Sequence, residues 1–246
     1  MEPLADPIAE GSRIAEAAAE RAVPLRLVGG VAVALSCPSS QHPPLQRRYG
    51  DIDFATSSGA KKKVSGLLEE LGYVPDREFN TLYGHRRLYF ADPFNQRQVD
   101  VFVDEAHLCH HIDFRRRLEV VPLTLAPADL ALMKLQVVET NEKDYLDLCA
   151  IFADHQLTED DSGVNCKYIT ELGASDWGLW RTLGIVAERA EGFALQLPGF
   201  DAAGQVADRL QRLRSKLDTI PKSRRWKLRS RVGERKRWYE IPEEVH

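Results

Sequence analysis

The chain has 246 residues, a formal net charge of −4 at pH 7, and 43% apolar against 28% charged residues. This composition is typical of a globular protein that is long enough to bury a substantial core. The sequence contains no apolar run of the roughly 20 residues that span a membrane, and its N-terminal segment lacks a signal-peptide core. The four cysteines are widely spaced and form no CxxC pair, which indicates reduced thiols. We therefore expect a cytoplasmic protein with no membrane partner.

Positive charge is concentrated near the C-terminus. Residues 209–237 hold thirteen Lys and Arg against two acids, Asp218 and Glu234. From residue 209 to the end, thirteen positive residues oppose five negative ones, so this segment carries +8 and the preceding 208 residues carry −12. A basic end on an acidic body indicates a polyanionic partner, and a solvated helical surface is the alternative that composition leaves open.

The first half of the chain alternates between helical and extended patterns. An Ala- and Glu-rich segment predicts a helix at the N-terminus, and a second helix is expected to end at Gly72. Gly29 and Gly30 form the turn between a short buried strand and an apolar helix. The predicted helices are 7–22, 31–36 and 61–73, the predicted strands are 25–30, 51–56, 85–92 and 97–104, and residues 37–50 are a predicted loop.

The second half is mostly helical. A strand-like segment at 118–125 is interrupted by Pro122, and helices follow at 126–140 and 143–155. Helical periodicity then continues to about residue 217, and a basic stretch that we expect to be loosely ordered ends the chain. The fold class is therefore α+β, a small mixed sheet with flanking helices followed by an all-helical domain. We expect a core at 1–120, a helical domain at 121–220 and a basic tail at 221–246.

Two carboxylates in the segment RRYGDIDFA (47–55) need an explanation. Asp51 and Asp53 alternate with Ile52 and Phe54, so in an extended chain both carboxylates project to one face. Asp is depleted in strands, and like charges on one face repel. Asp100 is a similar polar residue between two valines of a predicted strand. If the two strands pair side by side, all three carboxylates lie on one face.

A pair of hard divalent cations would compensate three crowded carboxylates, because carboxylate oxygens are the preferred ligands of such ions. Two metals about 3.5–4 Å apart hold the attacking and leaving oxygens of an in-line displacement. Gly29 and Gly30 would let a phosphate approach the backbone at a helix N-terminus. Taken singly, the glycines also fit a plain turn, the Asp51 and Asp53 pair fits an Asx turn, and Asp100 fits an exposed edge strand.

The order of these motifs resembles the nucleotidyltransferase superfamily typified by DNA polymerase β. The matching segments are LVGGVAVAL, GDIDFA and VDVFV, within approximately residues 23–155. Within the superfamily, RRYGDIDF (47–54), Lys134 in LALMKLQVV and KDYLDL (143–148) are similar to AbiEii-type and related minimal bacterial nucleotidyltransferases. The spacer of twenty residues at 31–50 is longer than the family usually has, and a surface loop tolerates such an insertion at low cost.

The resemblance implies a role for each matching residue. Asp51 and Asp53 would be ligands of both metals, two Mg²⁺ ions or Mn²⁺ in their place. Asp100 would be the third ligand and would help to deprotonate the attacking group. Residues expected to bind the nucleotide are Gly29 and Gly30 at the triphosphate, Lys134 at a phosphate, Asp144 beside Lys134 or the nucleotide, and Arg47 or Arg48 as added positive charge. The helical domain would complete the nucleotide cleft.

The implied activity is that of a transferase of the EC 2.7.7 type. An acceptor hydroxyl attacks the α-phosphate of an NTP (ATP, GTP or CTP), and pyrophosphate leaves. The resemblance and the basic segment 209–237 favour an RNA (tRNA) end or a protein as acceptor, and a toxin with an antitoxin partner. One alternative is a small-molecule nucleotidyltransferase that modifies an aminoglycoside or lincosamide antibiotic. Another is a non-catalytic nucleotide-binding module.

Other residues have plainer interpretations beside functional ones. Lys134 fits an amphipathic helix surface, and Asp147 fits a solvated helix face. The group His107, Cys109, His110 and His111 suggests zinc, but it lacks a second ligand pair, and a short helix with docked or exposed imidazoles is favoured. Two pairs of tryptophans remain: Trp226 and Trp238 either stack on bases or pin the tail, and Trp177 and Trp180 are expected in the core.

Overall fold

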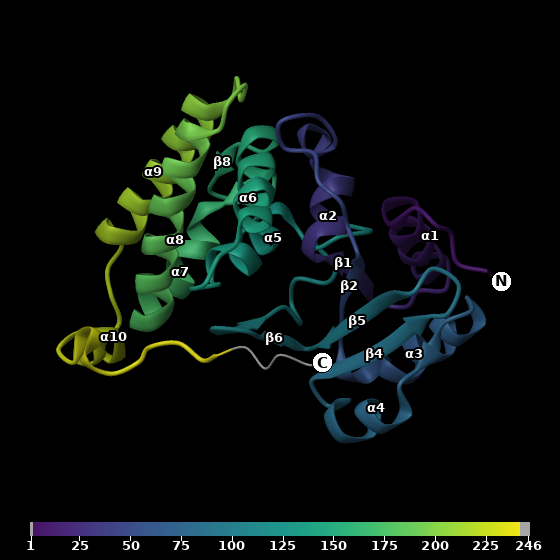
Figure 1. Ribbon diagram of the computed structural model, residues 1–246. Helices are drawn as coiled ribbons and strands as arrows, with labels where there is room; N and C mark the ends of the chain where they lie inside the picture. Colours follow the sequence, from purple (N-terminus) through teal and green to yellow (C-terminus); the bar gives the residue numbers. More distant parts are fainter. Residues whose placement is uncertain (1, 242–246) are drawn as a thin grey trace. The chain divides into compact units, whose positions relative to one another are not determined.

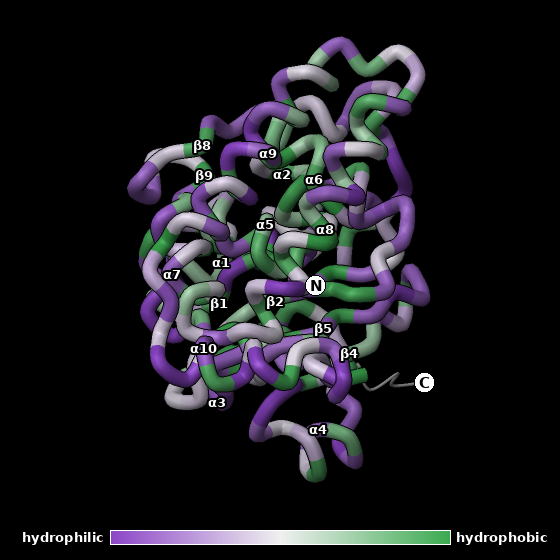
Figure 2. The backbone as a smooth tube through the Cα atoms, turned by 90° about the vertical axis from the view of Figure 1, so that its left-hand side faces the viewer, coloured by the Kyte–Doolittle hydropathy of each residue, from purple (hydrophilic) through white to green (hydrophobic). Residues whose placement is uncertain are grey.

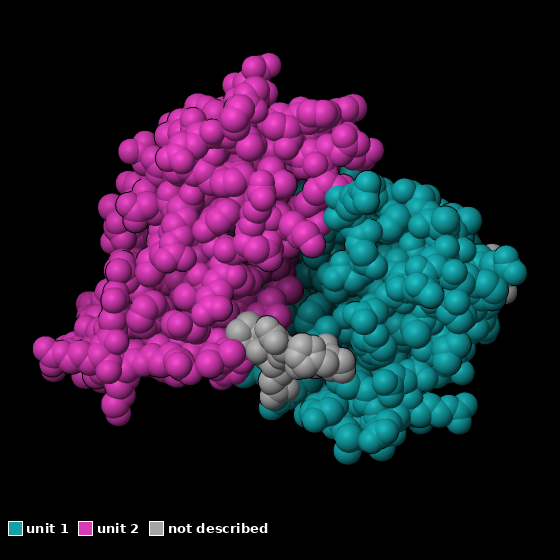
Figure 3. Space-filling view, viewed as in Figure 1, with its two compact units in different colours: residues 1–36, 48–107, 111–126 teal, residues 37–47, 108–110, 127–246 magenta. Residues whose placement is uncertain are grey.

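The computed structural model describes residues 2–241. These residues form two compact units, each built from several stretches of the chain (Figure 3). Unit 1 consists of residues 1–36, 48–107 and 111–126, and unit 2 consists of residues 37–47, 108–110 and 127–246. Most of the predicted loop at 37–50, namely residues 37–47, therefore belongs to unit 2.

Unit 1 is built on a five-stranded mixed sheet (Figure 1). Three pairings are antiparallel, and the central pair, β2 with β5, is parallel. The strand order is β1 (Leu25–Val28), β2 (Asp51–Thr56), β5 (Arg97–Val103), β4 (Arg87–Asp92) and β3 (Val74–Pro75). The predicted α+β class is confirmed, and each of the four predicted strands is present with small shifts at its ends.

One face of this sheet is the apolar core of unit 1. Ile52, Phe54, Val99 and Val101 alternate with polar residues along β2 and β5, and all four are fully buried. Buried apolar side chains come from helices α1 (Pro7–Glu20), α2 (Gly29–Ser36) and α3 (Lys61–Glu70). The 3-10 turn η2 (Ser58–Ala60) and helix α4 (Arg77–Tyr83) complete the helical part. The period of two in each strand thus leaves the alternate residues, including the three aspartates, on the opposite face.

Two sequence-based predictions for unit 1 are wrong. Residues 118–125 form no strand, and their only ladder contact is an isolated bridge between Leu27 and Thr124. The interruption by Pro122 is the physical reason, because proline has no N–H for a ladder. The histidine-rich segment is a hairpin of β6 (Glu105–His107) and β7 (His111–Asp113) instead of a short helix.

Unit 2 is a helical bundle with one small parallel ladder. Helix α5 is apolar almost throughout and is coloured mostly hydrophobic in Figure 2. Packing among α6, α8 and α9 buries residues such as Phe152, Leu183 and Leu210. The elements are η1 (Pro38–Gln41), α5 (Pro127–Leu135), α6 (Glu142–Asp154), β8 (Leu157–Thr158), β9 (Val164–Asn165), α7 (Cys166–Ser175), α8 (Trp177–Gln196), α9 (Ala203–Thr219), α10 (Arg224–Ser230) and η3 (Gly233–Arg235). The helix predicted at 126–140 is shorter and ends at Leu135.

The basic tail is more ordered than predicted over the described residues 221–241. Trp226 packs edge-on against Trp180 at 5.1 Å between ring centroids, and Trp238 packs edge-on against Trp177 at 6.2 Å. The indole N–H of Trp238 also donates to Thr182 Oγ1 at 3.1 Å. The alternative in which Trp226 and Trp238 pin the tail is therefore confirmed for these contacts, and residues 242–246 lie outside the described part.

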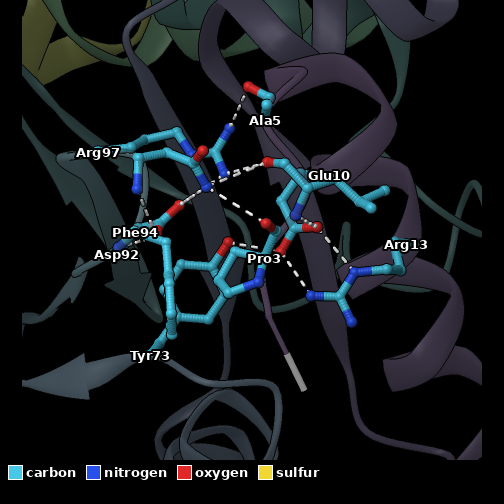
Figure 4. A network of polar contacts seen from close by, with 10 residues as sticks. Pro3, Ala5, Glu10, Arg13, Tyr73, Asp92, Phe94 and Arg97 are labelled. Carbon is cyan, nitrogen blue, oxygen red and sulfur yellow. Dashed lines mark hydrogen bonds and ion pairs between the residues drawn. The ribbon is translucent and has the colours of Figure 1, made fainter.

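A buried polar network fixes the N-terminal segment to the rest of unit 1 (Figure 4). Glu10 is fully buried and accepts hydrogen bonds from Arg13, from the Tyr73 hydroxyl and from the backbone N–H of Leu4. Beside it, Arg97 forms a buried ion pair with Asp92 at 2.7 Å and also donates to the carbonyl of Leu4. Buried charges of this kind are tolerated because each one is paired.

We expect Glu10→Gln to lower the free energy of unfolding of the protein at pH 7 by about 2 kcal/mol, because a charged acceptor with several donors is lost. Burial raises the pKa of Glu10, but the hydrogen bonds from Arg13, Tyr73 and Leu4 outweigh it and leave this pKa lowered. A lowered folded-state pKa contributes stability that is lost as pH falls below the unfolded value of about 4.3. Denaturant unfolding at pH 7 and near pH 3.5 should therefore show a smaller difference between the two proteins in acid.

Candidate functional site

The three predicted carboxylates lie on the polar face of the sheet of unit 1. The parallel ladder of β2 and β5 places Asp53 directly opposite Asp100 and Asp51 opposite Gln98. Neighbouring strands are about 4.8 Å apart, so Asp53 and Asp100 start from adjacent backbone positions and point to the same side. Asp100 is buried, Asp53 is half-buried, and Asp51 at the start of β2 is exposed.

Gly29 lies against the carboxylate of Asp53. It follows the last residue of β1, Val28, which pairs with Asp53 in the antiparallel ladder. Gly29 has a φ of +66°, and a Cβ built on it would lie 2.2 Å from Asp53 Oδ2. Glycine suits this position, because a side chain would strain the left-handed backbone and its Cβ would push against the Asp53 carboxylate. Gly29 and Gly30 form the first turn of α2, so the predicted glycine turn is also a helix N-terminus.

Arg87 is a residue of this face that the sequence interpretation missed. Its Nε donates to Asp100 Oδ1 at 2.6 Å, and its guanidinium lies over the ring of Phe102 at 5.5 Å. Burial lowers the pKa of Arg87, but the hydrogen bond to Asp100 and the charges of Asp100 and Asp53 outweigh it and leave this pKa raised. The signal available in the sequence was an Arg at an alternate position of the predicted strand HRRLYFAD, whereas its pairing beside Asp100 became evident only in the structure.

The polar face carries carboxylate donors of the kind that a hard cation prefers. Three carboxylates and one arginine leave a net charge of −2 there. In the described residues, Asp51, Asp53 and Asp100 are not a group whose oxygens all lie within 4.8 Å of one another. Binding of shared ions by all three carboxylates would therefore require their side chains to turn toward one another, with water and phosphate completing each coordination shell.

Gly29→Ala should lower the free energy of unfolding by about 1–3 kcal/mol, because alanine would be strained at this positive φ. Its Cβ would also displace the Asp53 carboxylate. The matched control is Gly66→Ala in α3, where a Cβ would meet nothing within 4 Å. Alanine is the better helix former, so this control should be neutral or stabilising. Equal melting temperatures for the two variants would contradict the close approach of Gly29 to Asp53.

Unit 2 contains a separate buried charge cluster. Lys134 Nζ lies 2.9 Å from a carboxylate oxygen of Asp144 and 2.9 Å from one of Asp147. Arg47 binds both oxygens of Asp147 at 2.8 Å, in the two-pronged geometry that guanidinium and carboxylate favour. Asp144 also forms a capping box with Asn141 at the start of α6. Two cations and two anions thus balance one another.

The surface interpretations of Lys134 and Asp147 are wrong. Asp147 is 1% exposed, and the side chain of Lys134 is 15% exposed. Burial lowers the pKa of Lys134, but the charges of Asp147 and Asp144 outweigh it and leave this pKa raised. The lysine therefore carries its charge at neutral pH. Arg48, next to Arg47, belongs to unit 1 and is exposed, so the two predicted arginines have different surroundings.

The histidine and cysteine group divides between the two units. Cys109 is buried, and its Sγ accepts the N–H of Val138 at 3.4 Å, while His110 Nε2 contacts Thr182 Oγ1 at 2.8 Å. Burial raises the pKa of the Cys109 thiol, which disfavours a nucleophilic thiolate. His107 and His111 belong to unit 1 and lie together with Glu105 on the hairpin.

No family model and no curated protein matches this chain. Solved structures that are similar include a protein from H. pylori provisionally described as a nucleotidyltransferase, at 12% identity and a TM-score of 0.37, covering 88% of this chain and 97% of that one. Another is JHP933 from Helicobacter pylori, at 13% identity and a TM-score of 0.39, covering 93% and 95%. At these TM-scores the similarity carries no weight, so function is inferred from the site. None of the described helices is both long and apolar enough to cross a bilayer.

Proposed function

We propose that the protein is a metal-dependent nucleotidyltransferase, which moves an NMP from an NTP to an acceptor hydroxyl and releases pyrophosphate. The single observation that carries this proposal is the parallel register of β2 and β5, which sets Asp53 beside Asp100 with Asp51 on the same face. The contact of Gly29 with Asp53 adds a helix N-terminus beside the carboxylates. Backbone N–H groups there suit a phosphate, and the carboxylates suit Mg²⁺.

Each residue of the face has a chemical task in this reaction. Asp51 and Asp53 would hold two Mg²⁺ ions, which neutralise phosphate charge and orient the reacting oxygens when bound. Asp100 would be the third ligand. It would accept the proton of the acceptor hydroxyl while the hydroxyl oxygen forms a bond to the α-phosphorus. The bond from that phosphorus to the pyrophosphate oxygen breaks on the opposite side. Arg87 orients the carboxylate of Asp100 through their hydrogen bond.

Further residues enter the proposal only through the resemblance. Lys134, Asp144, Arg47 and Arg48 remain predicted nucleotide-binding residues, and the helical unit remains the predicted partner of the nucleotide. In unit 2, the ion pairs of Lys134 and Arg47 with Asp144 and Asp147 are an alternative explanation for the same residues. Measuring both nucleotide affinity and unfolding free energy in variants of these residues would distinguish a role in nucleotide binding from a purely structural role.

The acceptor we favour is an RNA end, with a protein side chain as the other candidate. Several cations of the segment 209–237 already interact within unit 2. Arg209 donates hydrogen bonds to backbone carbonyls at the end of α6, and Arg214 forms an ion pair with Glu191. The exposed cations that remain near the end of the chain are Arg224, Arg225, Lys227, Arg231, Arg235, Lys236 and Arg237. Because the tryptophans there are packed, RNA contact would rest on charge more than on stacking.

Substituting Arg224, Arg225 and Lys227 together by Gln should weaken RNA binding by about tenfold or more at low salt. The slope of log affinity against log salt should fall by about 2, since each lost phosphate contact with a single strand contributes about 0.7. The control removes three exposed cations of unit 1, Lys62, Lys63 and Arg77, in the same way. Equal losses for both triple variants would remove the RNA proposal, and this design keeps Trp226 in place.

Incubation of the protein with each labelled NTP, Mg²⁺ and either total RNA, candidate proteins or antibiotics tests the proposed function and its rivals. Label that appears in RNA or protein supports the favoured acceptors, and a toxin role would add growth arrest on expression. Label on an aminoglycoside or lincosamide supports the small-molecule alternative. NTP binding without transfer to any acceptor would support a non-catalytic binding module and contradict the proposal.

A further inference from the structure

The hairpin of β6 and β7 gathers two imidazoles and a carboxylate on one face. His107 and His111 are directly opposite each other in the antiparallel register, with ring centroids 4.0 Å apart. Glu105 lies two residues before His107, so its side chain projects to the same face. Its carboxylate reaches both rings, at 2.8 Å to His107 Nε2 and 3.8 Å to His111 Nδ1.

The three side chains have the spacing of a metal site. One ligand atom from each lies within 4.8 Å of the other two, and this is the group with three His, Cys, Asp or Glu donors that the described residues offer. Tetrahedral zinc with bonds of about 2.0–2.1 Å separates its ligand atoms by about 3.4 Å. The glutamate lies close to that separation from both rings, with Oε1 at 2.8 Å from His107 Nε2 and Oε2 at 3.8 Å from His111 Nδ1. Small rotations of side chains would close the remaining difference.

The remaining acid of the hairpin strands is held by an arginine, so the candidate metal ligands stay at three. Asp113 is opposite Glu105 in the ladder and is the fourth acidic or imidazole side chain of the hairpin strands. Both its oxygens accept hydrogen bonds from Arg115, at 3.0 and 3.1 Å from Nε. The charge of Asp113 is thereby balanced by Arg115, so water would take the fourth position on the ion. The exposure of His111, 45% of its side chain, gives an ion access from solvent.

We propose that Glu105, His107 and His111 bind one Zn²⁺ ion, at a site separate from the three aspartates. Two imidazoles and one carboxylate are a donor set that zinc binds well, whereas Mg²⁺ prefers oxygen ligands only. The ion would link the two strands of the hairpin, because Glu105 and His107 belong to β6 and His111 belongs to β7. This inference goes beyond the proposed transferase reaction and does not rest on it.

The test is equilibrium dialysis of the full-length, metal-stripped protein against Zn²⁺ in the presence of millimolar Mg²⁺, which occupies oxygen-only sites. We expect one bound Zn²⁺ per chain, and a visible absorption band of tetrahedral Co²⁺ when cobalt replaces zinc. His107→Ala, His111→Ala and Glu105→Gln should each weaken binding by at least about tenfold, since even outer partners of metal ligands contribute that much. The control is His85→Ala, an exposed histidine of the same unit.

Two outcomes would overturn the site. Unchanged zinc binding in His111→Ala and in the double variant of both histidines would show that the hairpin is not the ligand. Zinc that is lost in Asp53→Asn but kept in the histidine variants would place the ion on the sheet face. The side chain of His111 is 45% exposed against 18% for His107, so the His111 variant remains informative even if replacement of His107 prevents folding.

Discussion

Replacement of Asp53 by Asn is expected to reduce NMP transfer by on the order of a thousandfold or more. The thermal stability of the protein, measured without NTP, should change little. The amide keeps the shape of the side chain beside Gly29 and removes one of three like charges on the sheet face. Loss of that repulsion should leave the melting temperature unchanged or raised. The measurement is transfer of labelled NMP to the acceptor, together with thermal unfolding of the same preparation.

The matched control is Glu69→Gln, which removes an exposed carboxylate from α3 of the same unit. Its transfer rate should equal that of the unmodified protein. Asp100→Asn should lose activity as Asp53→Asn does. Arg87→Gln should lose less, because it removes only the hydrogen bond that orients Asp100. Full activity in both aspartate variants would exclude the sheet face as the reaction centre.

Asp147→Ala should destabilise the protein by about 3–5 kcal/mol, which is the largest stability effect that we expect. Asp147 is buried, and its removal leaves Arg47 without its two-pronged partner and Lys134 with one carboxylate in place of two. Uncompensated buried charge is more costly than loss of the whole cluster. Urea unfolding at pH 7, followed by circular dichroism, measures the change.

Two further variants make this expectation specific. Asp208→Ala removes an exposed acid that pairs with Arg212 along α9 at 3.5 Å, and it should change stability by less than about 0.5 kcal/mol. Replacing Asp147 and Arg47 together by apolar residues leaves Lys134 paired with Asp144, and it should be less damaging than Asp147→Ala alone. If the single and the double variants unfold at the same urea concentration, the cluster is not coupled as its contacts indicate.

The local features of the proposed active site were predictable. Alternation of Asp51 and Asp53 with apolar residues predicts a strand with both carboxylates on one face, and β2 covers that segment. Glycines after an apolar strand predict a turn, and Gly29 has the positive φ that only glycine adopts readily. These signals depend on residues close together in the sequence, so period and residue type are sufficient.

Contacts between distant segments were less predictable. The partnership of Arg47 with Asp147 joins residues 100 positions apart, and sequence pattern alone favoured a solvated Asp147. Arg87 reaches Asp100 because β4 and β5 pair antiparallel with Tyr89 opposite Asp100, a register that neither strand specifies alone. The same applies to His107, whose assignment to a short helix failed because the hairpin brings it opposite His111.

By itself the sequence determined the α+β class, most helices and strands, and the face on which each aspartate of β2 and β5 projects. Periodicity of two or 3.6 residues is a local property, so it can be read without knowing what each element packs against. Tertiary structure alone decided that Asp53 is level with Asp100, that Arg87 neutralises part of their charge and that Glu105 joins two histidines. Strand register and buried ion pairs arise from closing loops between distant segments, and their energies depend on the partner met in three dimensions.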